Sequence, residues 1–311
     1  MTSKYNYSRD IKAPMTYGNY DLADIVRKGK MKKVVNFIQK QTKRYKSQIA
    51  GIESKSFQSY DNRDVGYYEF TPLDVKERYP AIVYIHGGGF MFPIQTMMMN
   101  VSSLYACNCG VKVFLPEYRY DLSNPQMMTL EDCYHMLKYV YDNADSLQVD
   151  RNKIIVYGDS AGGCLCAGVT LMNRDRDKYP LAGQMLLYPV IDNASYKYDS
   201  IDMYADAAWS KRSNTGMWEL YLSRNGEKEN YLVPINNDLH NLPRAYVEPQ
   251  EIDTLCDEGV AYAKKLEEAG VPVELNIILV SYHGFDAAIK SKLVQRVLKK
   301  RYEVIREFVG D

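Results

Sequence analysis

The strongest chemical signal in the chain is a serine flanked by glycines, in the segment 158–163 (Gly-Asp-Ser-Ala-Gly-Gly). The segment follows an apolar run at 153–157 and precedes a stretch with helical spacing, so Ser160 is expected on a strand–turn–helix junction. Glycines on either side permit a turn too sharp for a Cβ atom, which leaves the serine hydroxyl exposed at the start of a helix. In this context the pattern G-x-S-x-G predicts a nucleophile.

Three consecutive glycines, 87–89, follow His86 and another apolar run at 81–85. The backbone N–H groups of such a loop can point at an oxyanion that develops during a reaction. A glycine run can also hold a phosphate, but the Lys-Ser/Thr pair of a P-loop does not follow it here. A nucleophilic serine on a sharp turn needs N–H donors for the oxyanion from an earlier strand–helix loop, and the glycine loop is in that position. The two motifs therefore support each other.

The chain has four histidines from which a base for this serine can come. His283 follows the last predicted strand and precedes the last predicted helix, at the sheet edge where the serine loop also lies. His86 is expected to brace the glycine loop, His135 lies within a predicted helix, and His240 lies in a polar loop. We therefore predict that His283 is the base.

A carboxylate is also needed to orient the imidazole, and the chain order serine–acid–histidine places it between residues 160 and 283. The loop after the apolar run at 244–247 is the expected position. Its candidates are Glu248, Glu251, Asp253, Asp257 and Glu258. Position along the chain does not choose among these five.

Short apolar runs alternate with helical patterns, and these elements must position the candidate residues. The runs lie at 81–85, 111–115, 153–157, 184–188, 244–247 and 274–280, with a leading pair at 51–57 and 65–70. Runs this apolar indicate strands buried on both faces, and their alternation with helices indicates a parallel sheet. Helices are predicted at 130–141, 258–269 and 286–308, the first after a capping-box-like pair, Thr129 and Asp132. We predict one open, mostly parallel α/β domain over residues 1–311.

Two segments, at about 1–50 and 192–231, do not fit this alternation, and we expect them to form a cap over Ser160. The first contains apolar residues at helical spacing (Met31, Val34, Val35 and Ile38), and residues 27–46 carry nine Lys/Arg and no acid. A basic amphipathic helix can bind an anionic membrane. We favour a helix packed against its own domain, because the zero net charge gives membrane binding no further support.

Composition excludes several classes of protein. The 311 residues carry 39 Lys+Arg and 39 Asp+Glu, without the positive surplus of a nucleic-acid binder. No stretch approaches the roughly 20 apolar residues of a membrane span, and the first 15 residues have no apolar core of a secretory signal. Six cysteines in a chain of this length do not indicate a disulfide framework. We expect a cytoplasmic protein, for which a homodimer is one possible oligomeric state.

Taken together, the motifs resemble the hormone-sensitive-lipase-like family of α/β-hydrolase esterases over roughly residues 80–290. The segments 86–89 and 158–163 match its oxyanion and nucleophile motifs. Segment 253–259 resembles Asp-Pro-Leu-x-Asp-Glu-Gly, with Thr254 in place of proline, and 282–286 resembles the histidine motif. Residues 118–119 and 131–134 resemble the family's stretch between the first two motifs.

The resemblance implies an α/β-hydrolase fold with a helical cap and a triad of Ser160, His283 and Asp253. The oxyanion donors that it implies are the backbone N–H groups of Gly88, Gly89 and Ala161. No metal or organic cofactor is needed for this chemistry, and no cysteine–histidine cluster has the spacing of a zinc site.

The activity that we predict is hydrolysis of small-molecule esters with short, acetyl-like acyl groups. The 192–231 segment offers little continuous apolar surface to a long acyl chain, which would also meet Phe90, Met91 and Phe92 beside the glycine loop. One alternative is hydrolysis of an amide such as a formamide on the same triad. Another is a non-catalytic small-molecule receptor of the same fold, but such receptors lose the triad histidine, whereas this chain retains His283.

Overall fold

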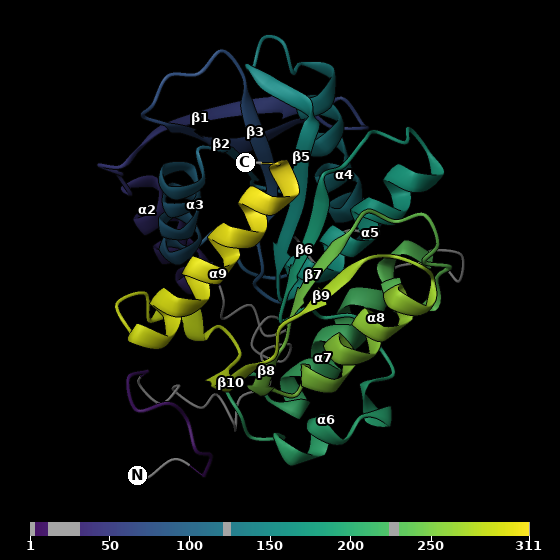
Figure 1. Cartoon of the computed structure of the whole chain (residues 1–311). Coiled ribbons are helices and arrows are strands. Elements are labelled where there is room, and N and C mark those ends of the chain that lie inside the picture. The colour runs from purple at the N-terminus through teal and green to yellow at the C-terminus, as the bar shows by residue number, and fades with distance from the viewer. Residues whose placement is uncertain (1–3, 12–31, 121–125, 224–229, 311) are drawn as a thin grey trace.

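The computed structural model describes residues 4–11, 32–120, 126–223 and 230–310, and in this part of the chain an eight-stranded sheet runs through the centre (Figure 1). The strands lie side by side in the order β1-β2-β4-β3-β5-β6-β7-β9. Their bounds are β1 Ala50–Gln58, β2 Asp64–Pro72, β3 Tyr79–Ile85, β4 Lys112–Pro116, β5 Val149–Asp159, β6 Gly183–Leu187, β7 Ala245–Glu248 and β9 Val273–Leu275. β1 and β2 pair antiparallel, as do β2 and β4, and every later pair in this order is parallel. The predicted mostly parallel sheet is confirmed.

Helices cover both faces of the sheet (Figure 1). α4 (Gln126–Asp142), α5 (Ala161–Asp175) and α8 (Cys256–Glu268) lie on one face, and α3 (Thr96–Cys109) and α9 (Lys292–Val309) on the other. Along β3 the side chains alternate between two hydrophobic clusters, with Val83 in the first and Ile82 and Tyr84 in the second. Because both clusters are buried, the central strands carry the continuous apolar runs seen in the sequence.

The segments outside this alternation form short elements. α6 (Asp199–Met203) and α7 (Lys211–Leu222) lie at the end of the molecule that also holds β8 (Gln250–Ile252) and β10 (Ile278–Tyr282) (Figure 1). In the basic N-terminal segment, α2 (Lys32–Lys43) packs beside α3, and the buried Thr42 donates a hydrogen bond to the carbonyl of Ile94 at 2.7 Å. Met31 and most of the rest of the predicted 1–50 cap segment before α2 lie outside the described residues.

The apolar run at 274–280 was expected as one strand and instead supplies two. β9 pairs with β7 at the edge of the main sheet, whereas β10 pairs with β8 in a separate two-stranded sheet. The cause lies on the partner side, where Pro249 separates β7 from β8 and its carbonyl accepts the amide of Ile278 at 2.9 Å. A break in the partner strand cannot be seen in the hydropathy of residues 274–280 themselves.

Two predicted helix starts are also wrong. The last helix begins at Lys292 rather than at 286, because the Ser291 hydroxyl caps it by accepting the amide of Val294 at 3.1 Å. The helix predicted from 130 begins at Gln126, so the expected capping pair lies inside it. The pair binds the preceding loop instead: the Thr129 hydroxyl donates to the Arg119 carbonyl, and Asp132 accepts from the Arg119 guanidinium.

A buried cation fixes α9 to the end of the sheet. Arg301 is fully buried, and its guanidinium donates to Glu248 at 2.6 Å and to Asp286 at 3.0 Å. Glu248 ends β7 and Asp286 lies in the turn that follows β10, and both carboxylates are buried. Glu248 also accepts from the Tyr246 hydroxyl at 2.7 Å, and Asp286 accepts from the Tyr188 hydroxyl at 2.9 Å.

We predict that Arg301→Met lowers the free energy of unfolding by about 3–5 kcal/mol, because it leaves two buried carboxylates without their cation. Arg306→Met is the matched control on the same helix. Arg306 is exposed and donates to a backbone carbonyl, so its loss is expected to cost about 1 kcal/mol or less. Urea unfolding of the three proteins measures both values, and equal losses in the two variants would contradict the assignment.

Candidate active site

Ser160 forms the turn between β5 and α5, as the sequence predicts. Its backbone is held at φ 56° and ψ −122°, a strained conformation for a residue with a side chain. A Cβ on Gly158 would lie 2.0 Å from the carbonyl oxygen of Gly162, and one on Gly162 would lie 2.0 Å from that of Ile85. Both positions therefore require glycine. The hydroxyl is less accessible than predicted, since Ser160 is only 5% exposed and His283 lies against it.

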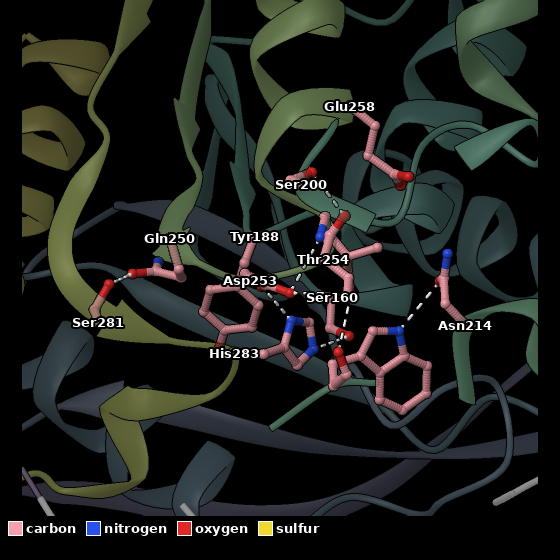
Figure 2. A network of polar contacts seen from close by, with 12 residues as sticks. Ser160, Tyr188, Ser200, Asn214, Gln250, Asp253, Thr254, Glu258, Ser281 and His283 are labelled. Carbon is pink, nitrogen blue, oxygen red and sulfur yellow. Dashed lines mark hydrogen bonds and ion pairs between the residues drawn. The ribbon is translucent and has the colours of Figure 1, made fainter. Parts of the chain in front are cut away.

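His283 joins Ser160 to Asp253 through its two ring nitrogens (Figure 2). The Ser160 hydroxyl donates to Nε2 of His283 at 2.8 Å, and Nδ1–H of His283 donates to Oδ2 of Asp253 at 2.7 Å. The histidine side chain is 12% exposed and the aspartate side chain is fully buried. The structure thus brings together the three residues that the sequence selected as nucleophile, base and acid, from segments 123 and 30 residues apart.

Asp253 is also oriented by its own loop. Its second oxygen, Oδ1, accepts the backbone amide of Leu255 at 3.2 Å, so both carboxylate oxygens have donors. The other four candidate carboxylates bind elsewhere in the described part of the chain. Their partners are Arg301 for Glu248, and the backbone amides of Val280 for Glu251, Ser200 for Asp257 and Ile191 for Glu258.

The remaining histidines lie away from Ser160 in the hydrogen-bond network. His86 is fully buried, stacks on Tyr118 with ring centroids 4.1 Å apart, and donates from Nδ1 to the Gly87 carbonyl at 2.7 Å. Burial lowers the pKa of His86 to about 4, so at neutral pH it is an uncharged brace for the glycine loop. His135 bonds within its own helix and His240 pairs with a neighbouring aspartate.

The glycine loop turns sharply in front of Ser160. Gly88 and Gly89 have φ values of 122° and 60°, and the amides of Met91 and Phe92 both donate to the Gly88 carbonyl at 3.0 Å. The Gly88 carbonyl oxygen therefore already accepts two hydrogen bonds within the turn. The amides of Gly88, Gly89 and Ala161 make no hydrogen bond to any other residue that the structure describes, and Ala161 is the first residue of α5. Three N–H donors therefore remain for a ligand.

Phe90 does not occupy the position that the sequence suggested. It is fully buried and stacks on Tyr221 of α7, with ring centroids 3.8 Å apart, so it joins the loop to the protein interior. Met91 and Phe92 do lie next to the oxyanion-loop glycines, Gly88 and Gly89. A Cβ on Gly89 would come within 3.2 Å of the Met91 side chain, and one on Gly88 within 3.0 Å of the Phe92 Cβ.

Two aromatic residues at the site were missed by the sequence analysis. Tyr188 meets the His283 ring edge to face at 4.9 Å, and Trp209 stacks on the same ring at 5.6 Å with a 30° angle between planes. Tyr188 directly follows β6 and has a positive φ of 34°, whereas Trp209 lies in the irregular segment before α7. Position after a parallel strand was a usable signal for Tyr188. Nothing in the local sequence distinguishes Trp209.

The described residues contain no group of three or more His, Cys, Asp or Glu side chains arranged to hold a metal ion. No described helix is both long and apolar enough to cross a membrane. The six cysteines are all unpaired, and Cys107 is exposed while the other five, including Cys164 and Cys166 after the serine turn, are buried.

Comparison with known proteins shows the family of the chain. A family model for the alpha/beta hydrolase fold matches residues 82–287. The carboxylesterase NlhH of Mycobacterium tuberculosis is 32% identical over 239 residues, which are 72% of this chain and 75% of that protein. An ethyl acetate hydrolase of Pseudomonas putida is 28% identical over 212 residues, 66% of this chain and 65% of that protein. The structure of a bacterial heroin esterase matches with a TM-score of 0.84 and 28% identity, covering 93% of each chain.

The chain therefore belongs to the alpha/beta hydrolase fold family. Within that family it belongs with the hormone-sensitive-lipase-like esterases that its motifs resemble, and it is an enzyme that hydrolyses carboxylic esters.

Asp159, the residue before the serine, is a second acidic group at the site. It is 3% exposed, and its Oδ1 has no hydrogen-bond partner within the described ranges. A Cβ on Gly87 would lie 2.5 Å from its Oδ2, so the carboxyl presses against the glycine loop. Burial, followed by the negative charge of Asp286, raises the pKa of Asp159 to about 7.

We predict that the stability of Asp159→Asn relative to the natural protein rises between pH 4 and pH 7. An unfolded aspartate loses its proton near its ordinary pKa of 3.8, whereas the folded carboxyl keeps it to about pH 7. The folded natural protein therefore binds more protons in this window and loses stability as pH increases, while an amide does not titrate. Urea unfolding at several pH values measures the difference, with exposed Asp64→Asn as control. A difference that does not change with pH would contradict the prediction.

Proposed function

We propose that this enzyme hydrolyses esters through a catalytic triad of Ser160, His283 and Asp253. The observation that carries the proposal is the unbroken chain of two hydrogen bonds, of 2.8 Å and 2.7 Å, from the serine hydroxyl through the imidazole to a buried carboxylate. This is the arrangement that nucleophilic catalysis by serine requires. A receptor of the same fold would not need it.

In the proposed reaction the Ser160 oxygen bonds to the ester carbonyl carbon while its proton passes to Nε2 of His283. Asp253 holds the ring in the tautomer that leaves Nε2 free to accept, and stabilises the imidazolium that forms. When the tetrahedral intermediate collapses, the bond to the alcohol oxygen breaks and that oxygen takes the proton from Nε2. A water molecule then attacks the acyl-serine in the same way, releasing the carboxylic acid and restoring the serine hydroxyl.

The negative charge in each intermediate is on the former carbonyl oxygen, and we assign its stabilisation to the amides of Gly88, Gly89 and Ala161. They have no other acceptor among the described residues, and that of Ala161 is at the positive end of the α5 dipole. Donors fixed before the reaction need no rearrangement when the charge develops, which is why such groups contribute strongly to catalysis.

We predict that Ser160→Ala lowers kcat on p-nitrophenyl acetate by a factor on the order of 10⁴–10⁶ without lowering the unfolding temperature. The strained backbone at Ser160 remains, but alanine has no oxygen to bond to carbon. Initial rates at saturating substrate measure the loss, with thermal unfolding as the folding control. Activity within tenfold of the natural protein would remove Ser160 as the nucleophile.

We further propose that the preferred acyl groups are short, from acetyl to butyryl. A Cβ on Gly88 would lie 3.0 Å from the Phe92 Cβ, and one on Gly89 would lie 3.2 Å from the Met91 side chain and from the Trp209 ring, so large side chains crowd the loop that we assign to the oxyanion. An acyl chain gains about 0.8 kcal/mol for each methylene that it buries, and a site closed by large side chains offers little surface for that gain. The ethyl acetate hydrolase among the relatives supports this preference, since its name states an acetyl ester.

A series of p-nitrophenyl esters from acetate to palmitate, at one pH, tests the acyl preference. We expect the largest kcat/KM between acetate and butyrate and a steep fall beyond roughly six to eight carbons, because discrimination follows differential binding of the transition state. Ser160→Ala supplies the background rate for each ester. A maximum at decanoate or longer would contradict the proposal and indicate an open acyl groove.

A further inference from the structure

Trp209 contacts three separate parts of the proposed catalytic apparatus. Its ring stacks on the imidazole of His283, and its Cη2 atom would lie 3.2 Å from a Cβ on the oxyanion glycine Gly89. Its backbone carbonyl accepts a hydrogen bond from Thr254, the neighbour of Asp253. We infer that Trp209 is a positioning residue, which holds the histidine, the acid loop and the oxyanion loop in register for the chemistry.

The imidazole needs such support because its two hydrogen bonds do not prevent the ring from tilting out of its plane. The bonds to Ser160 and Asp253 both lie in the ring plane, so they resist displacement out of that plane only weakly. Two aromatic rings supply the missing restraint. Tyr188 meets the imidazole edge to face at 4.9 Å, with its hydroxyl fixed by Asp286, and Trp209 stacks at 5.6 Å.

Trp209 is itself held at both ends. At the ring, Nε1–H donates to the Asn214 side chain at 3.1 Å, and Asn214 in turn donates to the Ser195 hydroxyl at 2.9 Å. All of these residues are buried, with Trp209 only 8% exposed. Figure 2 shows Asn214 on one side of the site, with its dashed bond to the indole, and Gln250 and Ser281 on the other.

At the backbone, the anchor is Thr254, the position where this chain departs from the family's proline. Its hydroxyl donates to the Trp209 carbonyl at 3.0 Å, and its own carbonyl accepts the Ser200 hydroxyl at 3.0 Å. Proline has no hydroxyl and offers no such donor. The threonine therefore ties the loop that carries Asp253 to the segment between α6 and α7, and through it to the ring on His283.

This inference rests on the proposed triad and deepens it. It makes the stretch between α6 and α7, which lies in the predicted cap segment, part of the working site. A displacement of about 1 Å in a catalytic group can reduce a rate about a hundredfold. Loss of the indole should therefore lower kcat with little change in KM, because the ring holds groups that act in the transition state.

The main experiment compares Trp209→Ala with Trp209→Phe. On p-nitrophenyl acetate we expect the alanine variant to lose about tenfold to a hundredfold in kcat with KM within about threefold of the natural protein. The phenylalanine variant keeps a ring against His283 and is expected to recover most of the loss. A second readout is the rate at which diethyl p-nitrophenyl phosphate inactivates each protein. There the Ser160 oxygen bonds to phosphorus, p-nitrophenolate leaves and the serine proton passes to His283.

Trp218→Ala is the matched control. Trp218 is the other tryptophan of the chain and is buried to a similar degree at 4% exposure, but its ring packs on Tyr221, whereas the Trp209 ring stacks on His283. Its loss removes the same volume from the same segment, so kcat within about threefold of the natural protein is expected. A kcat for Trp209→Ala within threefold of the natural protein, or an equal fall in Trp218→Ala, would overturn the inference.

Thr254 gives an independent test that leaves the indole intact and serves if Trp209→Ala does not fold. Thr254→Val removes the hydroxyl at constant shape, and Thr254→Ser keeps it. We expect kcat to fall by about threefold to tenfold in the first only, and equal values in the two variants would contradict the tether. Ser160→Ala distinguishes failure of the triad from failure of the positioning role. If Ser160→Ala stays active, the proposed triad is wrong. If it is inactive while the Trp209 and Thr254 variants keep the kcat of the natural protein, only the positioning role is wrong.

Discussion

The close approach of β5, α5 and β3 at Ser160 is the constraint on which the rest of the site depends. No Cβ fits at Gly158 or Gly162, so α5 can begin directly against the end of β3, where the carbonyl of Ile85 lies. That contact places the glycine loop, which continues from β3, beside the first turn of α5. One steric requirement therefore brings the nucleophile and the N–H donors from both loops to the same point. The strained backbone of Ser160 is the cost of this arrangement.

The histidine is positioned by a different set of forces, which come from buried polar groups. Arg301 holds Asp286, Asp286 holds the hydroxyl of Tyr188, and the Tyr188 ring meets His283. Each link is a hydrogen bond or a ring contact inside the protein, where an unpaired group would be costly. Through this chain of contacts, a cation on α9 is linked to the ring of the proposed base.

The residues whose position depends on a local pattern could be predicted from the sequence. The glycines around Ser160 and Gly88 are fixed by local sterics, and the acid motif selected Asp253, which among the five candidate carboxylates is the one that bonds to His283 in the described part of the chain. Two features that escaped prediction depend on partners distant along the chain. The division of the 274–280 run follows from Pro249 between β7 and β8, and Trp209 reaches His283 across 74 residues of sequence. Hydropathy and spacing describe a segment's own periodicity and carry no information about such partners.

The buried Arg301 also has a consequence for synthesis of the chain. When a ribosome has completed β7 and the turn after His283, Glu248 and Asp286 have been made, but their shared cation on α9 has not. Burying two carboxylates without their cation is costly, so this corner of the sheet gains its full stability only when α9 packs against it. The last helix to be synthesised therefore completes the polar network on which the Tyr188 hydroxyl and, through the Tyr188 ring, His283 rest.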